Sequence, residues 1–234
     1  MLSLTAQRAV AAYGGEKLWK KAETIEAVVS AHGLAFTLKR RPIFKHARMQ
    51  MQVHKPAARF TPIGKDPKIT GVWSGRDVHL EDGAGNVIAA RSNARSYFPF
   101  GRRLFYWDDL DMTYFANYAT WNYLTLPALL LNPDIGWTEK EPGLLEGVFP
   151  ETIPSHSRVQ TFRFDLNTGR LLQHNYTADV ISRLANAANV VHGHSDSNGI
   201  AFTSRRIVTP QKPSGRPMGG PVLIDLTIHE FSMT

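Results

Sequence analysis

The sequence predicts an α+β fold that is built mainly on an antiparallel β-sheet, and three observations support this. Several segments alternate apolar with polar residues, as Arg48–His54 does, which is typical of strands with one buried face. Short turns separate pairs of such segments, as Asn167–Gly169 does. One aromatic segment, residues 107–131, instead repeats its apolar residues at spacings of three and four, which indicates a helix. The alternation also disfavours a parallel nucleotide-binding sheet, whose strands would read as continuous apolar runs.

The N-terminal part of the chain is predicted to pass from helix into strands. Residues 3–20 have helical spacing that Gly14–Gly15 interrupts, so either one broken helix or two short helices are expected. Thr24–Lys39 begins with β-branched residues and is predicted to be a strand or a bent pair of strands. Arg48–His54 is predicted to be a half-buried strand. Its apolar face carries Met49, Met51 and Val53.

One predicted hairpin lies before the aromatic segment, and two further strands close the chain. Val72–Leu80 and Val87–Arg91 flank a turn of small and polar residues, so they are expected to pair. Ile200–Thr209 and Val222–Phe231 are the closing strands. The proline-rich and glycine-rich residues 210–221 cannot pair in a sheet and are expected to form an exposed loop. In the last strand, the residues expected to point inward are Val222, Ile224, Leu226 and Ile228.

The second predicted hairpin supplies candidate cavity residues. Val159–Asp165 and Leu171–Asp179 are joined by Asn167–Gly169, in which the glycine allows the positive φ that such turns need. Because side chains alternate along a strand, Phe162 and Phe164 share one face of the first arm. The matching face of the second arm carries Leu172, His174, Tyr176 and Ala178.

The helical insert, about residues 107–131, is the most aromatic stretch of the chain. Asp109 or Asp111 is expected to cap its first helix, which ends before Pro127, and a further turn is expected through Ala128–Leu131. Its apolar residues cover too wide a sector for an ordinary surface helix, so the insert is expected to pack inside a curved sheet or to cover a cavity. The aromatic face carries Tyr114, Phe115, Tyr118 and Trp121.

Length and composition are those of one globular domain, residues 1–234. The chain is 43% hydrophobic and 20% charged, which is enough apolar material to build a core. It contains no cysteine, so disulfides, thiolate zinc sites, iron–sulfur clusters and cysteine nucleophiles are excluded.

Charge and hydropathy indicate whether a membrane or a nucleic acid is an expected partner. Residues 1–15 do not resemble a secretory signal, which favours a cytoplasmic location. The longest apolar run, Leu124–Leu131, is broken by Pro127, so no membrane span is expected. The net charge of +7 would permit attraction to nucleic acid or to an anionic membrane, but the basic residues are dispersed and match no nucleic-acid-binding motif. No nucleic-acid partner is therefore expected.

The order of elements resembles a known architecture. An N-terminal helical region that carries Gly14–Trp19, the hairpin within Gly71–Arg91 and the insert at 107–131 follow one another as in the LolA/LppX lipoprotein-carrier half-barrel superfamily. The resemblance implies a strongly curved antiparallel sheet whose concave face holds apolar helices and acyl chains, with the insert as plug or lid. The sequence lacks the signal peptide and the lipobox cysteine of the lipoprotein members. Only the fold and a capacity for apolar ligands are therefore carried over.

Several clusters of polar residues have side chains that could form a metal site or a catalytic site. His192, His194 and Asp196 could in principle hold a metal, but they run into a turn-like sequence and are expected to be a polar hairpin tip. The acidic run Asp108–Asp111 is explained by helix capping. No nucleophile elbow, P-loop or Rossmann turn is present in the sequence. No metal site and no cofactor are therefore expected.

Two functions remain, and both use one cavity. The preferred hypothesis is a soluble protein that binds a hydrophobic or aromatic small molecule. Its expected ligand-binding residues are Tyr114, Tyr118, Trp121, Trp73, Phe162 and Phe164. The alternative is a cofactor-independent enzyme of the cyclase, isomerase or hydrolase type, with acid and base groups drawn from His174, Tyr176, His156 and Asp109. A hydrogen-bonded pair inside a wet cavity is the favoured explanation of His174 and Tyr176, because partly buried polar side chains commonly find such partners. The oligomeric state is left open.

Overall fold

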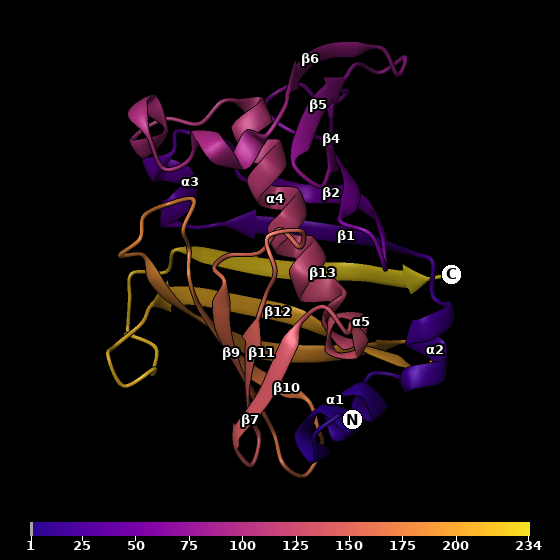
Figure 1. Cartoon of the computed structure of the whole chain (residues 1–234). Helices are drawn as coiled ribbons and strands as arrows, with labels where there is room; N and C mark the ends of the chain where they lie inside the picture. Colours follow the sequence, from indigo (N-terminus) through magenta and orange to yellow (C-terminus); the bar gives the residue numbers. More distant parts are fainter. Residues whose placement is uncertain (1) are drawn as a thin grey trace.

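An open, curved antiparallel sheet organises the chain, as a half-barrel with helices in and beside its concave face (Figure 1). The computed structural model describes residues 2–234, which form one sheet of 13 strands. In chain order the elements are α1 (Leu4–Ala12), α2 (Glu16–Lys21), β1 (Thr24–His32), α3 (Leu34–Leu38), β2 (Phe44–Gln52), β3 (Ala57–Thr61), β4 (Thr70–Ser74), β5 (Asp77–Glu81), β6 (Val87–Arg91), the 3₁₀ helices η1 (Ala94–Tyr97) and η2 (Gly101–Leu104), α4 (Asp109–Leu124), α5 (Leu126–Leu131), β7 (Gly136–Glu141), β8 (Leu144–Val148), β9 (Val159–Phe164), β10 (Leu171–Thr177), β11 (Asn186–Ser197), β12 (Ile200–Pro210) and β13 (Ile224–Met233).

The strand order shows how the insert is placed. The order is β6-β5-β4-β3-β2-β1-β13-β12-β11-β10-β9-β8-β7, so the chain winds outward from the centre to one edge and later returns from the other edge. The helices α4 and α5 connect β6 at one edge to β7 at the opposite edge. The insert must therefore cross the face of the half-barrel, and Figure 1 shows α4 lying in front of the strands.

The two glycines of the N-terminal region separate two short helices. Gly14 and Gly15 have φ values of 105° and 89°, which side chains rarely tolerate, so α1 and α2 cannot be continuous. Trp19 of α2 is buried, and its indole nitrogen donates to the carbonyl of Tyr13 at 2.7 Å. The interruption predicted at the glycines is therefore confirmed, as two helices.

The segment predicted as a strand over Thr24–Lys39 is only partly one. β1 ends at His32, and Gly33, with φ 134°, turns the chain into the short helix α3. The amides of Leu34 and Ala35 donate to carbonyls of residues 222 and 223, which precede β13. These bonds to a distant segment outweigh the local strand preference, so the strand prediction was wrong beyond His32.

The prediction that Val72–Leu80 forms a single strand was also wrong, because this segment folds into a hairpin of two strands. β4 and β5 pair from Ser74 with Asp77 onward, around a two-residue turn in which Gly75 has φ 56°. The pairing with β6 over Val87–Arg91 is as predicted. Strands β3, β7, β8 and β11 had not been predicted.

The hairpin of β9 and β10 was predicted correctly, apart from one residue. Phe162 and Phe164 are buried together, and so are His174 and Tyr176. The register shifts between Leu171 and Gln173, so Leu171 is buried while Leu172, expected inward, is 42% exposed. In β13, Leu226 and Ile228 are buried as expected, whereas Val222 is exposed and precedes the strand.

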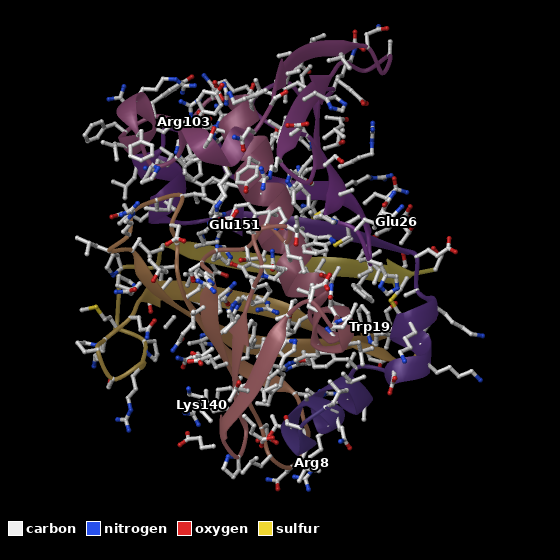
Figure 2. The ribbon with its side chains drawn as sticks, viewed as in Figure 1. Arg8, Trp19, Glu26, Arg103, Lys140 and Glu151 are labelled. Atoms are coloured by element: carbon white, nitrogen blue, oxygen red, sulfur yellow. The ribbon has the colours of Figure 1, made fainter. Side chains whose placement is uncertain are left out.

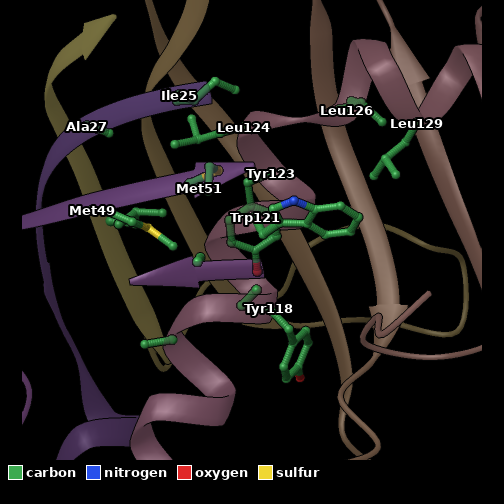
Figure 3. Close-up of a cluster of buried hydrophobic side chains, with 14 of the residues drawn as sticks. Ile25, Ala27, Met49, Met51, Tyr118, Trp121, Tyr123, Leu124, Leu126 and Leu129 are labelled. Carbon is green, nitrogen blue, oxygen red and sulfur yellow. The ribbon is translucent and has the colours of Figure 1, made fainter. Parts of the chain in front are cut away.

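The helix α4 is buried on every side, and this defines the core. All residues from Leu110 to Leu124 are buried, as expected for a helix enclosed by other elements. Figure 3 shows Trp121, Tyr123 and Leu124 beside Met49 and Met51 of β2. The insert therefore fills the concave face rather than lying on the surface.

The start of α4 is fixed by charged groups, although not by the cap that was predicted. The N-cap is Asp108, whose side chain accepts from the amide of Asp111 at 2.8 Å, while Asp111 accepts from the amide of Asp108 at 3.2 Å. The Asp111 carboxylate is buried and accepts from Arg91 and Arg103, each at 2.6 Å. These bonds anchor η2 and β6 to the helix, because Arg103 and Arg91 come from those elements.

Candidate functional site

A chain of buried hydrogen bonds centred on His156 lies beside α4. The Tyr118 hydroxyl is 3.2 Å from Nδ1 of His156, and the Tyr123 hydroxyl is 2.8 Å from Nε2. The Tyr123 hydroxyl also lies 2.8 Å from that of Tyr176. Both nitrogens of one imidazole are thus held by tyrosines of the insert, and the chain continues to β10.

Ring stacking places the second histidine in the same cluster. The rings of His156 and Tyr176 are stacked at 3.8 Å between centroids, and those of His174 and Phe162 at 4.1 Å. Nε2 of His174 is 2.7 Å from the side-chain oxygen of Gln160. The structure therefore brings together His156, His174 and Tyr176, which the sequence suggested as acid and base groups.

The protonation states in this cluster follow from burial. Burial lowers the pKa of His156 well below its ordinary value, and the charges of Arg95 and Arg206 act in the same direction. Burial lowers the pKa of His174 in the same way, with His156 and Arg206 as further causes. Burial raises the pKa of the hydroxyls of Tyr118, Tyr123 and Tyr176 above the ordinary value. At neutral pH the cluster therefore consists of neutral imidazoles and protonated phenols.

Arg206 brings a permanent positive charge to the inner end of the cluster. Its Nε donates to Thr203 at 3.0 Å and its Nη2 to the carbonyl of Tyr123 at 3.2 Å, while the guanidinium lies 4.7 Å from the Tyr123 ring. Burial lowers its pKa, and the groups that oppose this are tyrosines. Within residues 2–234, Nη1 of Arg206 finds no hydrogen-bond partner. The inner end can therefore still donate a hydrogen bond.

A large cleft opens next to the cluster. Its volume is about 920 Å³, and it lies between the segment around η1 and the segment that joins β8 to β9. Its apolar wall consists of Phe98, Tyr114, Val148, Phe149 and Ile153. Its polar groups include Arg76, Arg95, Arg158, Asp134, Glu151 and Asp179. Figure 2 shows Glu151 in front of the helix and strands, where the half-barrel opens.

Arg95 and Ser155 connect the cleft to the buried cluster. Arg95 donates to the carbonyl of Ser155 at 2.7 Å and to that of His156 at 3.4 Å, and it lies 3.5 Å from Asp179. Arg95, Ser155 and Asp179 all line the cleft. On the helix, the ring of Tyr114 in the cleft lies 5.1 Å from that of Tyr118 in the cluster. Only one layer of side chains therefore separates His156 from the cleft.

The residues expected to bind ligand are placed differently from one another. Tyr114 lines the cleft, and Tyr118 belongs to the cluster. Trp121 and Trp73 are buried edge to face at 5.8 Å, and Phe162 and Phe164 are buried in the wall of the sheet. Beside the insert there are two small pockets of about 20 and 30 Å³, and Tyr123 lines both. All six residues are thus buried in the core, and of them only Tyr114 also lines the cleft.

Other sequence candidates lie away from the cluster. Asp109 forms an ion pair with Arg41 at the N-terminal end of α4. The segment of His192, His194 and Asp196 lies near the tip of the β11–β12 hairpin, as expected, and His194 is 3.0 Å from the Tyr13 hydroxyl. In the part of the chain that the structure describes, no group of three histidine or acidic side chains could hold a metal ion. No helix there is long and apolar enough to cross a membrane.

Three members of the cluster, Arg206, Gln160 and Asn189, were not predicted from the sequence. Tyr123 belongs to the group of aromatic residues expected beside the inward strand residues. Arg206 is separated from the apolar residues Phe202 and Val208 by an even number of positions, so all three point to the same face of the strand. This spacing indicates in the sequence that Arg206 points inward. Gln160 likewise shares the parity of Phe162. Asn189 could not be placed, because its strand had not been predicted.

Comparisons with known proteins identify the fold. No protein-family model matches the sequence. No curated protein matches it at a significant level. A LolA superfamily protein from Nitrosomonas europaea matches with a TM-score of 0.52 and 9% identity, over 99% of this chain and 93% of that chain. A DUF1329 family protein from Desulfovibrio piger matches with a TM-score of 0.52 and 9% identity, over 97% of this chain and 90% of that chain.

A third solved structure is similar at a lower score. A putative outer membrane lipoprotein-sorting protein domain from Vibrio parahaemolyticus has a TM-score of 0.48 and 12% identity, over 98% of this chain and 90% of that chain. At such low identities the likeness concerns the fold alone. The chain has a LolA-like half-barrel fold, as the order of its elements had suggested.

Proposed function

We propose that this LolA-like half-barrel binds a hydrophobic or aromatic small molecule in the cleft beside its helical insert. The observation that carries the proposal is the cleft itself, whose volume of about 920 Å³ lies within the range of ligand sites, roughly 300–1,000 Å³. It is walled on one side by the insert, through Tyr114, and on the other by the segment from Val148 to Ser155.

The lining of the cleft favours a ligand with an apolar body and polar groups. Phe98, Tyr114 and Ile153 offer apolar and aromatic surface, and burying such surface contributes about 25 cal/mol per Å². Arg76 and Arg158 add positive charge and Asp134 and Glu151 add negative charge, so the cleft can bind polar groups of either sign. The fold supports the same conclusion, because the resemblance to lipoprotein carriers implies a capacity for apolar ligands.

Binding is tested by native mass spectrometry of the purified protein, followed by denaturing extraction and by fluorescence titration with a fatty acid and an aromatic dye. We expect either a co-purifying apolar compound or saturable binding of one probe. Val148→Trp should fill part of the cleft and weaken binding by at least about tenfold, since a misfitted group displaces the ligand. Val87→Trp, at an exposed position of β6, is the matched control. A protein that carries no compound and binds no probe contradicts the proposal, as does equal binding by both variants.

A second candidate function is acid–base catalysis, and the position of His156 favours it. A neutral imidazole with a lowered pKa can accept a proton, and the two tyrosine hydroxyls on its nitrogens can relay one. Ser155, the adjacent residue, lines the cleft. The reaction would then be a proton transfer at a carbon of the ligand.

This candidate is tested by proton exchange, which needs no knowledge of the product. The compound extracted from the protein is incubated with protein in D₂O, and its mass is followed. We expect deuterium to enter the compound with the unchanged protein and exchange to fall by at least about a hundredfold with His156→Gln, which cannot accept the proton. His194→Gln, a half-buried histidine outside the cluster, should exchange normally. Incorporation that is absent, or equal in both variants, excludes the catalytic role and leaves the binding role intact.

A further inference from the structure

A group of exposed apolar side chains covers one end of the molecule. They come from two segments, the region around α3 and the region around η2, and the most exposed are Phe105 at 70% and Phe100 at 63%. We call this surface the apolar–basic patch, and its apolar members are Leu38, Ile43, Phe100, Leu104, Phe105 and Tyr106. Scattered exposed apolar residues are ordinary, but a group of this kind on one face marks an interaction site.

Hydrogen bonds join the two segments into one platform. Nζ of Lys39 donates to the carbonyls of Arg103 and Leu104, at 3.0 and 2.8 Å. The amide of Trp107 donates to the carbonyl of Lys39 at 3.2 Å, and Arg41 donates to the carbonyl of Trp107 at 3.3 Å. The end of α3 and the end of η2 are thus bonded side by side. In Figure 1 the two segments also lie at the same side of the molecule.

The exposure of the two phenylalanines is imposed by a braced framework. The amide of Phe105 donates to the carbonyl of Arg102 at 2.9 Å, and Arg103 is held by Asp111 at the start of α4. Arg102 is bound by Asp108 in the same cap. Phe100 and Phe105 flank η2, so the turn holds both side chains outward. Figure 2 shows Arg103 at the same end of the molecule.

The charge of the patch selects one kind of partner. Residues 34–46 contain Lys39, Arg40, Arg41 and Lys45 and no acidic residue. Arg40 and Lys45 are exposed beside Leu38 and Ile43. A second copy of the chain docked face to face would bring these cations together, and like charges oppose such contact. Aromatic side chains next to exposed cations are instead the arrangement by which proteins attach to the surface of an anionic bilayer.

We propose that the apolar–basic patch docks on an anionic membrane surface. Phe100 and Phe105 enter the boundary between headgroups and acyl chains, while Arg40 and Lys45 face the anionic headgroups. The attachment is peripheral, and it stands on the patch alone, whatever the cleft binds. The chain runs directly from Ser96 and Phe98 in the cleft to Phe100 in the patch, so docking would hold the cleft close to the lipid.

Vesicle flotation tests this proposal. The probes are vesicles of phosphatidylcholine alone and vesicles of phosphatidylcholine mixed with phosphatidylglycerol. We expect the protein to float with the anionic vesicles only, and less so as salt increases, because exposed charges are screened. The double substitution Phe100→Ser and Phe105→Ser should weaken this association by at least about tenfold. The matched control, Val87→Ser with Ile88→Ser, removes two exposed apolar residues from β6 and should float like the unchanged protein.

Each other outcome overturns the proposal. Absence of the protein from the floating anionic vesicles does so directly. Equal flotation by the two double variants shows that the patch is not the docking surface. If the protein also floats with neutral vesicles, and the double substitution Arg40→Glu and Lys45→Glu does not change this, charge has no role in the attachment. The protein could instead self-associate with rising concentration and bind no vesicles. If the substitutions of Phe100 and Phe105 abolish this self-association, the partner is a second copy of the chain. The cleft titration with Val148→Trp is read separately, so failure of one proposal leaves the other standing.

Discussion

Acidification from pH 7 to pH 5 should lower the free energy of unfolding by about 4 kcal/mol, because His156 and His174 fold as neutral imidazoles. Their pKa values lie well below 6.5 in the folded chain and near 6.5 once the chain unfolds. The unfolded chain therefore binds more protons below about pH 6.5. Stability is fully present above that pH and falls below it, by about 1.4 kcal/mol per pH unit for each ring that stays neutral.

Urea unfolding followed by tryptophan fluorescence at a series of pH values measures this slope. His174→Gln should remove about a third of the dependence, since His156 remains and burial also lowers the pKa of His194, to about 4. His229→Gln is the control, because this ring lies outside the cluster, in an exposed contact with Ser30. A flat profile between pH 7 and pH 5 would mean that the two rings are already charged in the folded protein, contrary to the neutral cluster described above.

Trp121→Ala should destabilise the protein by about 3–5 kcal/mol, which is the usual cost of emptying a large aromatic site in a core. Trp121 is 2% exposed, packs against Trp73 and donates from its indole nitrogen to the carbonyl of Gln52 at 2.7 Å. Chemical unfolding measures the loss. Trp121→Phe should cost less, because it keeps most of the apolar contact and loses chiefly the hydrogen bond, worth about 0.5–1.5 kcal/mol.

The same pair of variants separates a core role from the ligand-binding role that the sequence suggested for Trp121. Phe105→Ala, an exposed aromatic position, should change stability by less than about 0.5 kcal/mol and calibrates the measurement. If Trp121→Ala leaves stability nearly unchanged and abolishes ligand binding, Trp121 faces the ligand and the packing described above does not govern its role.

The parts of the fold that the sequence could predict are those with a strong local pattern. The aromatic insert was recognised because three-and-four spacing persists through Tyr114, Tyr118 and Trp121, and such a wide apolar sector requires enclosure. The β9–β10 hairpin was recognised from its turn and its alternation. The short strands β7 and β8 were not predicted, because their alternation of apolar and polar residues is weak. Leu172 was predicted to point inward, but a shift of register in the pairing of β9 with β10, which no local pattern reveals, exposes it.

The candidate site was predicted in part, for a related reason. His156, His174 and Tyr176 were named because of residue type and strand parity, and they do lie together. Their hydrogen-bond partners come from elements far apart in the sequence, such as Tyr123 of α4 and Gln160 of β9. Which of many polar side chains meet across a sheet depends on strand order and register. Those are fixed by the whole fold, so the cluster could not be assembled from local patterns.

The pairing of β1 with β13 has a consequence for how the chain is made. Within each half of the sheet, neighbouring strands are also neighbours in the sequence. The two halves meet where β1 pairs with β13, a strand that is synthesised much later than β1. Until β13 leaves the ribosome, one side of β1 remains an open strand edge, and open edges are templates for aggregation. Contacts so distant in sequence also form slowly. The nascent chain is therefore most exposed to misassembly along β1, and a chaperone that shields this strand would have its greatest effect there.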